Sequence, residues 1–185
     1  FDITPAMREK AAGGLPMFDL TVKQGRIRRT IDEIVAMAEE QATWKDWYDR
    51  HKGVVDRLFG ADANLFQKIL SATSQLQTVK GNVTMALRAY EMMVSGQPFT
   101  GFLPSVAKNL ERIRAGQSTS GQKISEFEAG NLGDNEAMAV DRHIAQLFFN
   151  TSAPSRAQVE SAKKRMRVAA DRLGWTPKQA QAALW

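Results

Sequence analysis

The chain has 185 residues, a formal net charge of +5 and a hydrophobic content of 43%. Its length suits one domain, and the absence of cysteine excludes disulfides, thiolate zinc sites and iron–sulfur clusters. The two histidines, His51 and His143, supply too few nitrogens for a histidine-rich metal centre, so the sequence predicts neither a metal nor another cofactor. The positive charge favours an anionic partner, although a merely solvated basic surface is the alternative.

The first 22 residues differ from the rest of the chain. Residues 1–22 contain Pro5 and Pro16 and have no sustained hydrophobic period, which predicts an extended N-terminal arm or inter-domain segment. Residues 23–185 are predicted to form a single helical domain. No apolar run approaches the roughly 18 residues that a membrane-spanning helix needs, and there is no signal peptide. We therefore expect a soluble, cytoplasmic protein without a membrane partner.

The hydrophobic spacing is helical from residue 25 onward. Apolar residues recur at three and four positions from Ile27 to Ala38 and again from Trp47 to Phe59, which predicts two helices. Thr43–Asp46 has the composition of a cap for the second helix. The aromatic residues near this start are predicted to lie in the core, because their spacing fits one helix face: Trp44, Trp47 and Tyr48.

The remainder of the chain repeats this pattern. Further helices are indicated around residues 65–70, 79–94, 106–113, 123–127, 140–148 and 155–173, and from Thr176 onward. Residues 106–127 read as helix, tight hairpin, helix. No internal repeat and no strand-like alternation longer than four residues is present. The predicted class is all-α, a compact multi-helix domain with a helix-hairpin-helix element.

The two ends of the sequence suggest a longer polypeptide. The chain begins on Phe1 without methionine and stops at Trp185 inside a helical pattern. Residues 1–18 resemble the Thr-Pro-x-Met-Arg…Gly-x-Pro-x-Phe segments between domains of large polyvalent bacteriophage proteins. We therefore expect a monomeric part of a larger, phage-encoded protein that acts in the bacterial host cell.

Lys123 and Asp141 stand 18 positions apart on successive predicted helices. Lys123 falls in the first turn after Gly121, where the helix dipole disfavours a cation, so its placement invites a functional explanation. A lysine nucleophile must be neutral, and partial burial would favour the neutral amine. An exposed lysine that anchors a phosphate is the alternative. Asp141 is either a helix cap or ion-pair partner, or a carboxylate that faces a site.

Three segments carry a resemblance to a known family. Ile69–Ser74 resembles a helix-end segment of the form Leu-Leu-Ser-x-Gln-x, and Ser120–Ile124 resembles the second half of the hairpin motif Leu-Pro-Gly-Val-Gly-x-Lys-Thr. Val140–Ile144 resembles a Val-Asp-Thr-His-Val segment. Residues from about 62 to 150 are thereby similar to the helix-hairpin-helix DNA glycosylase superfamily.

The resemblance implies a function and two catalytic residues. The chain would be a DNA glycosylase that flips a modified or damaged base and cleaves its N-glycosidic bond, with a Schiff-base lyase step. Lys123 would attack the anomeric carbon of the sugar, and Asp141 would stabilise the cationic sugar as the base leaves. The spacing of the two residues agrees with lyase-type members of the family. DNA is the expected partner.

The same segments and the basic helix before the hairpin supply candidate DNA- and base-binding residues. In place of Leu-Pro-Gly-Val this chain has Gln117–Ser120, so the glycine-lined phosphate cradle keeps only Gly121. Loop capping is the alternative for Thr73 and Gln75, and a core position for His143. The candidates are Ser71, Thr73, Ser74, Gln75, Lys108, Arg112, Ser118, Thr119, Ser120, Gly121, Gln122 and His143.

Two other functions remain open at this point. A phage DNA base-hypermodifying transferase on the same fold would use Asp141 to deprotonate an incoming amine. A non-catalytic DNA-binding or protein-interaction module would bind in a salt-dependent way and would be indifferent to Asp141.

Overall fold

The computed structural model describes residues 29–185, and the arm predicted at residues 1–22 lies outside the described residues. Every regular element between residues 29 and 185 is helical, which confirms the predicted all-α class. The elements are α2 (Ile31–Glu40), η1 (Ala42–Trp44), α3 (Trp47–Phe59), η2 (Gly60–Asp62), α4 (Ala63–Thr73), α5 (Val79–Val94), α6 (Pro104–Arg114), α7 (Gln122–Leu132), α8 (Arg142–Phe149), α9 (Arg156–Leu173) and α10 (Pro177–Leu184). Within this part of the chain, no helix has the length and apolar character needed to cross a membrane.

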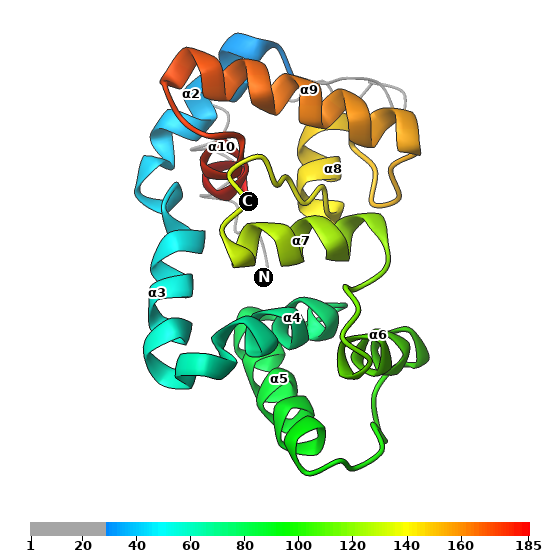
Figure 1. Cartoon of the computed structure of the whole chain (residues 1–185). Helices are drawn as coiled ribbons and strands as arrows, with labels where there is room; N and C mark the ends of the chain where they lie inside the picture. Colours follow the sequence, from blue (N-terminus) through cyan, green and yellow to red (C-terminus); the bar gives the residue numbers. More distant parts are fainter. Residues whose placement is uncertain (1–28) are drawn as a thin grey trace, which may run out of the picture.

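Two apolar clusters divide the helices into two groups (Figure 1). One cluster joins α3, α4, α5 and α6 and contains Phe66 and Leu110. The other joins α2, α8 and α9 around Ile34, Phe148 and Met166. Helix α7 lies between the two groups, and α3, which belongs to the first group, also contacts α7 and α10 (Figure 1).

Local sequence signals account for most helix ends. The helix predicted from Thr176 onward begins with a capping box, in which the Thr176 side chain accepts from the backbone N–H of Gln179 and the Gln179 side chain accepts from the backbone N–H of Thr176. A second capping box begins α9 at Ser155, and Gly174 ends that helix in the left-handed conformation. Thr43–Asp46 differs from the prediction: its first two residues belong to the 3-10 helix η1, and the Asp46 side chain does not cap α3.

The aromatic residues at the start of α3 do not all lie in the core. Tyr48 is buried as predicted, but Trp47 is half-buried and Trp44 is 53% exposed. The core prediction is therefore wrong for both tryptophans. Helical spacing shows that residues share a face, but it does not show whether another element covers that face.

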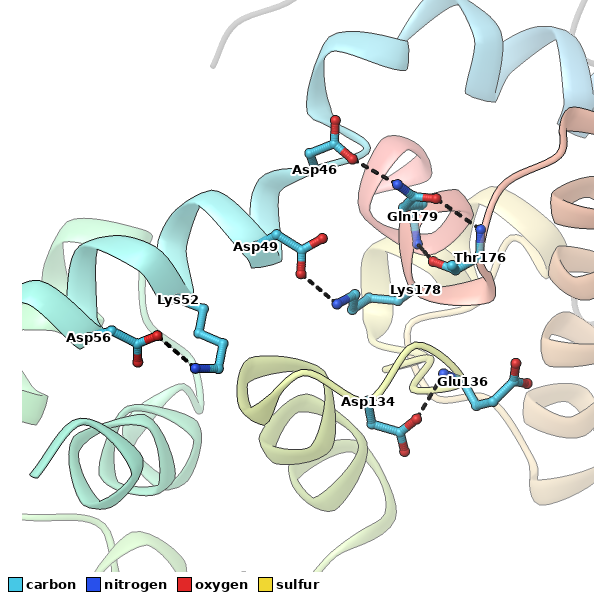
Figure 2. A network of polar contacts seen from close by, with 9 residues as sticks. All are labelled: Asp46, Asp49, Lys52, Asp56, Asp134, Glu136, Thr176, Lys178 and Gln179. Atoms are coloured by element: carbon cyan, nitrogen blue, oxygen red, sulfur yellow. Dashed lines mark hydrogen bonds and ion pairs between the residues drawn. The ribbon is translucent and has the colours of Figure 1, made fainter. Parts of the chain in front are cut away.

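Polar contacts fix α10 against α3 (Figure 2). The Lys178 side chain is 2% exposed and donates to a carboxylate oxygen of Asp49 at 2.6 Å. One residue on, the Gln179 amide donates to Asp46 at 2.8 Å. Because α10 carries Gln181 and ends beside Trp185, these contacts also position two residues of the site described below.

Asp49→Asn should lower the free energy of unfolding by about 1–3 kcal/mol, because it leaves the buried Lys178 ammonium without a counter-charge. Urea denaturation of the full chain measures this change. Asp56→Asn is the matched control, since it removes the partner of the more exposed Lys52 and should cost no more than about 1 kcal/mol. Equal losses in the two variants would show that the buried lysine does not depend on Asp49.

Candidate functional site

Lys123 and Asp141 lie on the wall of one cavity, which has a volume of about 600 Å³. The cavity is formed by α3, α4, the α4–α5 loop, the start of α5, α7, residues 139–143, the loop after α8, and α10 with Trp185. It therefore occupies the space between the two groups of helices. The sequence spacing predicted that the amine and the carboxylate would meet, and the fold places both on this surface.

Asp141 is held by three hydrogen bonds. Its Oδ1 accepts from the backbone N–H groups of His143 at 2.8 Å and Ile144 at 3.0 Å, so it is the N-cap of α8. Its Oδ2 accepts from the indole Nε1–H of Trp185 at 3.0 Å. The residue is 8% exposed. Asp141 can therefore cap α8 through Oδ1 while Oδ2 contacts Trp185 in the cavity.

Lys123 is the second residue of α7, after the N-cap Gly121, whose φ of 106° suits glycine. Its side chain is exposed, so the partial burial that would favour a neutral amine is not seen, and the position also fits the alternative of a phosphate anchor. Within residues 29–185 it forms neither an ion pair nor a side-chain hydrogen bond. The amine is consequently free to meet a ligand in the cavity.

An aromatic wall faces these two residues. The Trp47 ring stacks on His51 with centroids 5.1 Å apart and lies parallel to Phe127 at 6.4 Å. Trp185 meets Trp47 edge-on at 5.6 Å. Tyr48 completes the wall and donates its hydroxyl to Gln181 at 2.9 Å. Flat aromatic faces of this kind stack on planar ring systems.

Two titratable groups of this wall are held neutral by their surroundings. Burial, followed by the charge of Asp141, raises the pKa of Tyr48, so its phenol remains protonated at neutral pH. Burial lowers the pKa of His51, and the neighbouring Gln67 side chain offsets part of that effect. His51 Nε2 and the Gln67 amide do not reach full hydrogen-bonding geometry with any described residue. The aromatic wall that faces Asp141 is therefore uncharged.

His51 predicts a pH dependence of stability. Below the ordinary histidine pKa of about 6.5, His51 binds a proton in the unfolded chain more readily than in the folded chain, where its pKa is lowered. Its contribution to stability is therefore lost as the pH falls from about 7 to 5. His51→Gln should show a smaller fall in the urea midpoint over this range than the parent, whereas His143→Gln, at an exposed position, should match the parent. If His51→Gln loses as much as the parent, the lowered pKa is contradicted.

The hairpin loop between α6 and α7 turns its backbone inward. The N–H of Thr119 donates to the buried carboxylate of Glu128 at 2.9 Å, and the N–H of Ser120 donates to Asn109 at 2.7 Å. Arg112 donates through Nε to the carbonyl of Ser118. Two amides of the predicted phosphate cradle, at Thr119 and Ser120, are thus already used inside the protein. The prediction of backbone phosphate contacts at these two residues is corrected accordingly.

The α4 segment contributes less to the cavity than expected. Ser71 is fully buried and hydrogen-bonds Asn131, and the Thr73 hydroxyl is buried against Asn82 at 2.7 Å. Both residues hold helices together and are not positioned to touch a base. Gln75 accepts from Ser105 and does not line the cavity, whereas Ser74 does. Of this segment, Leu70 and Ser74 therefore line the cavity.

Of the candidate DNA-binding residues outside the α4 segment, only some line the cavity. His143 lines the cavity, whereas the remaining candidates do not line it: Lys108, Arg112, Ser118, Thr119, Ser120, Gly121 and Gln122. Arg142 is an exposed cavity residue that the sequence analysis missed, although it stands beside Asp141. Lys123, Arg142 and His143 form a basic rim. Within residues 29–185, no three His, Asp or Glu side chains come together to hold a metal ion.

Leu76 is a further cavity residue that sequence reasoning missed. It lies in the α4–α5 loop with φ = 56°, a conformation that costs a non-glycine residue energy, and its side chain is 83% exposed. The signal that could have found it is an apolar residue within the polar break between two helices. An exposed apolar side chain at the cavity edge is suited to contact a ligand.

No protein-family model, curated protein or solved structure matches the chain. Arguments about its function therefore rest on the geometry of the cavity.

Proposed function

We propose that this chain is a DNA glycosylase of the helix-hairpin-helix type, which takes an extruded nucleotide into the cavity and cleaves its N-glycosidic bond. The observation that carries the proposal is the shared position of Lys123 and Asp141 on one aromatic-lined cavity. An amine, a carboxylate and stacking surfaces are the groups that this reaction needs.

The cavity has the size and lining of a nucleoside site. Its volume of about 600 Å³ falls within the range of roughly 300–1,000 Å³ that small-molecule sites occupy. Trp47 and Phe127 offer flat faces for a base, and the Asp141 carboxylate is the acidic group next to which a cationic sugar would be stabilised. The lining therefore supports a planar base joined to a sugar.

The chemical step follows from the two groups. The Lys123 amine, after losing its proton to solvent, forms a bond to the sugar's anomeric carbon while the bond from that carbon to the base breaks. The base leaves with the electron pair and takes a proton from water. Asp141 stabilises the positive charge that the sugar carries as the bond breaks. Opening of the sugar ring then converts the lysine adduct to a Schiff base.

The cavity edge supports binding of a nucleic-acid strand. Lys123, Arg142 and His143 place basic groups at the edge, where the phosphates beside an extruded nucleotide would lie. Leu76, the most exposed apolar residue of the lining, could enter the gap left in a base stack. Lys108 is exposed on α6 and remains a candidate for a more distant phosphate contact.

Nucleoside mass spectrometry tests this function. The full chain is incubated with oligonucleotides that each carry one damaged or modified base, and the reaction is examined for free base. The proposal expects free base and an oligonucleotide that lacks it. A heavier nucleoside in the presence of an amine donor would instead establish a transferase, and binding without either product would establish a non-catalytic module.

A further inference from the structure

The indole N–H of Trp185 donates to Oδ2 of Asp141, the carboxylate oxygen that does not take part in the α8 cap. Both backbone N–H groups of the cap contact Oδ1, and Trp185 Nε1–H contacts Oδ2 at 3.0 Å. The terminal torsion of an aspartate is soft, so contacts to a single oxygen leave the carboxylate plane free to rotate. A donor on the second oxygen fixes that plane.

Trp185 is itself held in place. Its ring packs edge-on against Trp47 at 5.6 Å, and it stands at the end of α10, which Lys178 and Gln179 fix to α3. It lines the candidate cavity and also a neighbouring cavity of about 440 Å³. The side chain is 47% exposed, so one face remains available to a ligand.

We propose that Trp185 is a positioning residue for Asp141: its N–H fixes Oδ2 so that the remaining lone pair of this oxygen points at the sugar. The catalytic part of this inference rests on the proposed function, whereas the hydrogen bond can be tested without any activity. The ring and the N–H have separate tasks. The ring closes the cavity wall, and the N–H orients the carboxylate.

Nuclear magnetic resonance of the indole N–H groups tests the hydrogen bond directly. The chain has four tryptophans, and the Trp185 signal is the one that disappears in Trp185→Phe. A hydrogen bond to a carboxylate shifts this proton downfield. Asp141→Ala should therefore move the Trp185 signal upfield and leave the Trp175 signal in place. An unchanged Trp185 signal would overturn the proposal, whether or not the chain is a glycosylase.

Kinetics test the positioning role. Trp185→Phe keeps a ring but removes the donor, so kcat should fall about tenfold or more while KM stays within about twofold. Trp185→Ala removes the ring as well and should also raise KM. Trp44→Phe is the matched control, because Trp44 lines only the neighbouring cavity of the two and should behave as the parent. A raised KM with unchanged kcat in Trp185→Phe would show that Trp185 contributes only to substrate binding, and would overturn the positioning role.

Discussion

Asp141→Asn should lower turnover roughly 100- to 1,000-fold while keeping the cap of α8, at a stability cost of about 1 kcal/mol for the lost hydrogen bond from Trp185. Asparagine is as good an N-cap as aspartate, so its side-chain oxygen can still accept from the N–H groups of His143 and Ile144. It carries no charge, however, and cannot stabilise a cationic sugar. Turnover is measured as base release, and stability as the urea midpoint.

Asp141→Ala separates the two roles of this residue. It removes the cap together with the charge, so it should lose a similar amount of turnover and in addition about 1 kcal/mol of unfolding free energy. If Asp141→Asn retains full turnover while Asp141→Ala loses stability, the carboxylate is a cap alone. That result would contradict its catalytic role without questioning the fold.

Lys123→Arg should abolish the covalent step while preserving much of the affinity for DNA. Arginine keeps the positive charge at the cavity edge, but it stays protonated and cannot act as the nucleophile. Base release should fall by at least about 100-fold, the order of effect expected when a catalytic group is removed. Fluorescence anisotropy with a labelled oligonucleotide measures affinity in parallel.

Two further variants decide between a nucleophile and a phosphate anchor at this position. Lys123→Gln removes charge and nucleophile together and should weaken binding as well. Lys164→Gln removes one exposed positive charge from α9, away from the cavity lining, and should match the parent in base release. A Lys123→Arg variant that releases base at the parent rate would identify Lys123 as an anchor for phosphate.

The helices could be predicted from the sequence because their signals are local. Apolar residues repeat along one face in α3 and α5, and the cap at Thr176 lies within four residues of its partner Gln179. The capping role of Asp141 could also be predicted locally, because a helix that starts after Val140 needs an N-cap at this position. These features need no knowledge of distant parts of the chain.

The cavity wall could not be predicted in the same way, because it depends on contacts between distant segments. Trp47 lines the cavity together with Phe127 of α7 and Trp185 at the end of α10, and Asp141 meets Trp185 across 44 positions of sequence. The inward turn of the hairpin amides depends on Glu128, a buried acid that periodicity alone does not identify. The sequence also left open whether Lys123 is partly buried or exposed, and it is exposed among residues 29–185.

Borohydride trapping followed by peptide mapping tests the central claim most directly. The full chain is incubated with DNA that carries a substrate base, reduced with borohydride, digested and examined by mass spectrometry. We expect a sugar adduct on the peptide that contains Lys123, and its loss in both Asp141→Asn and Lys123→Arg. Base release without any adduct, or an adduct on a different lysine, would contradict the assignment of Lys123 as the nucleophile.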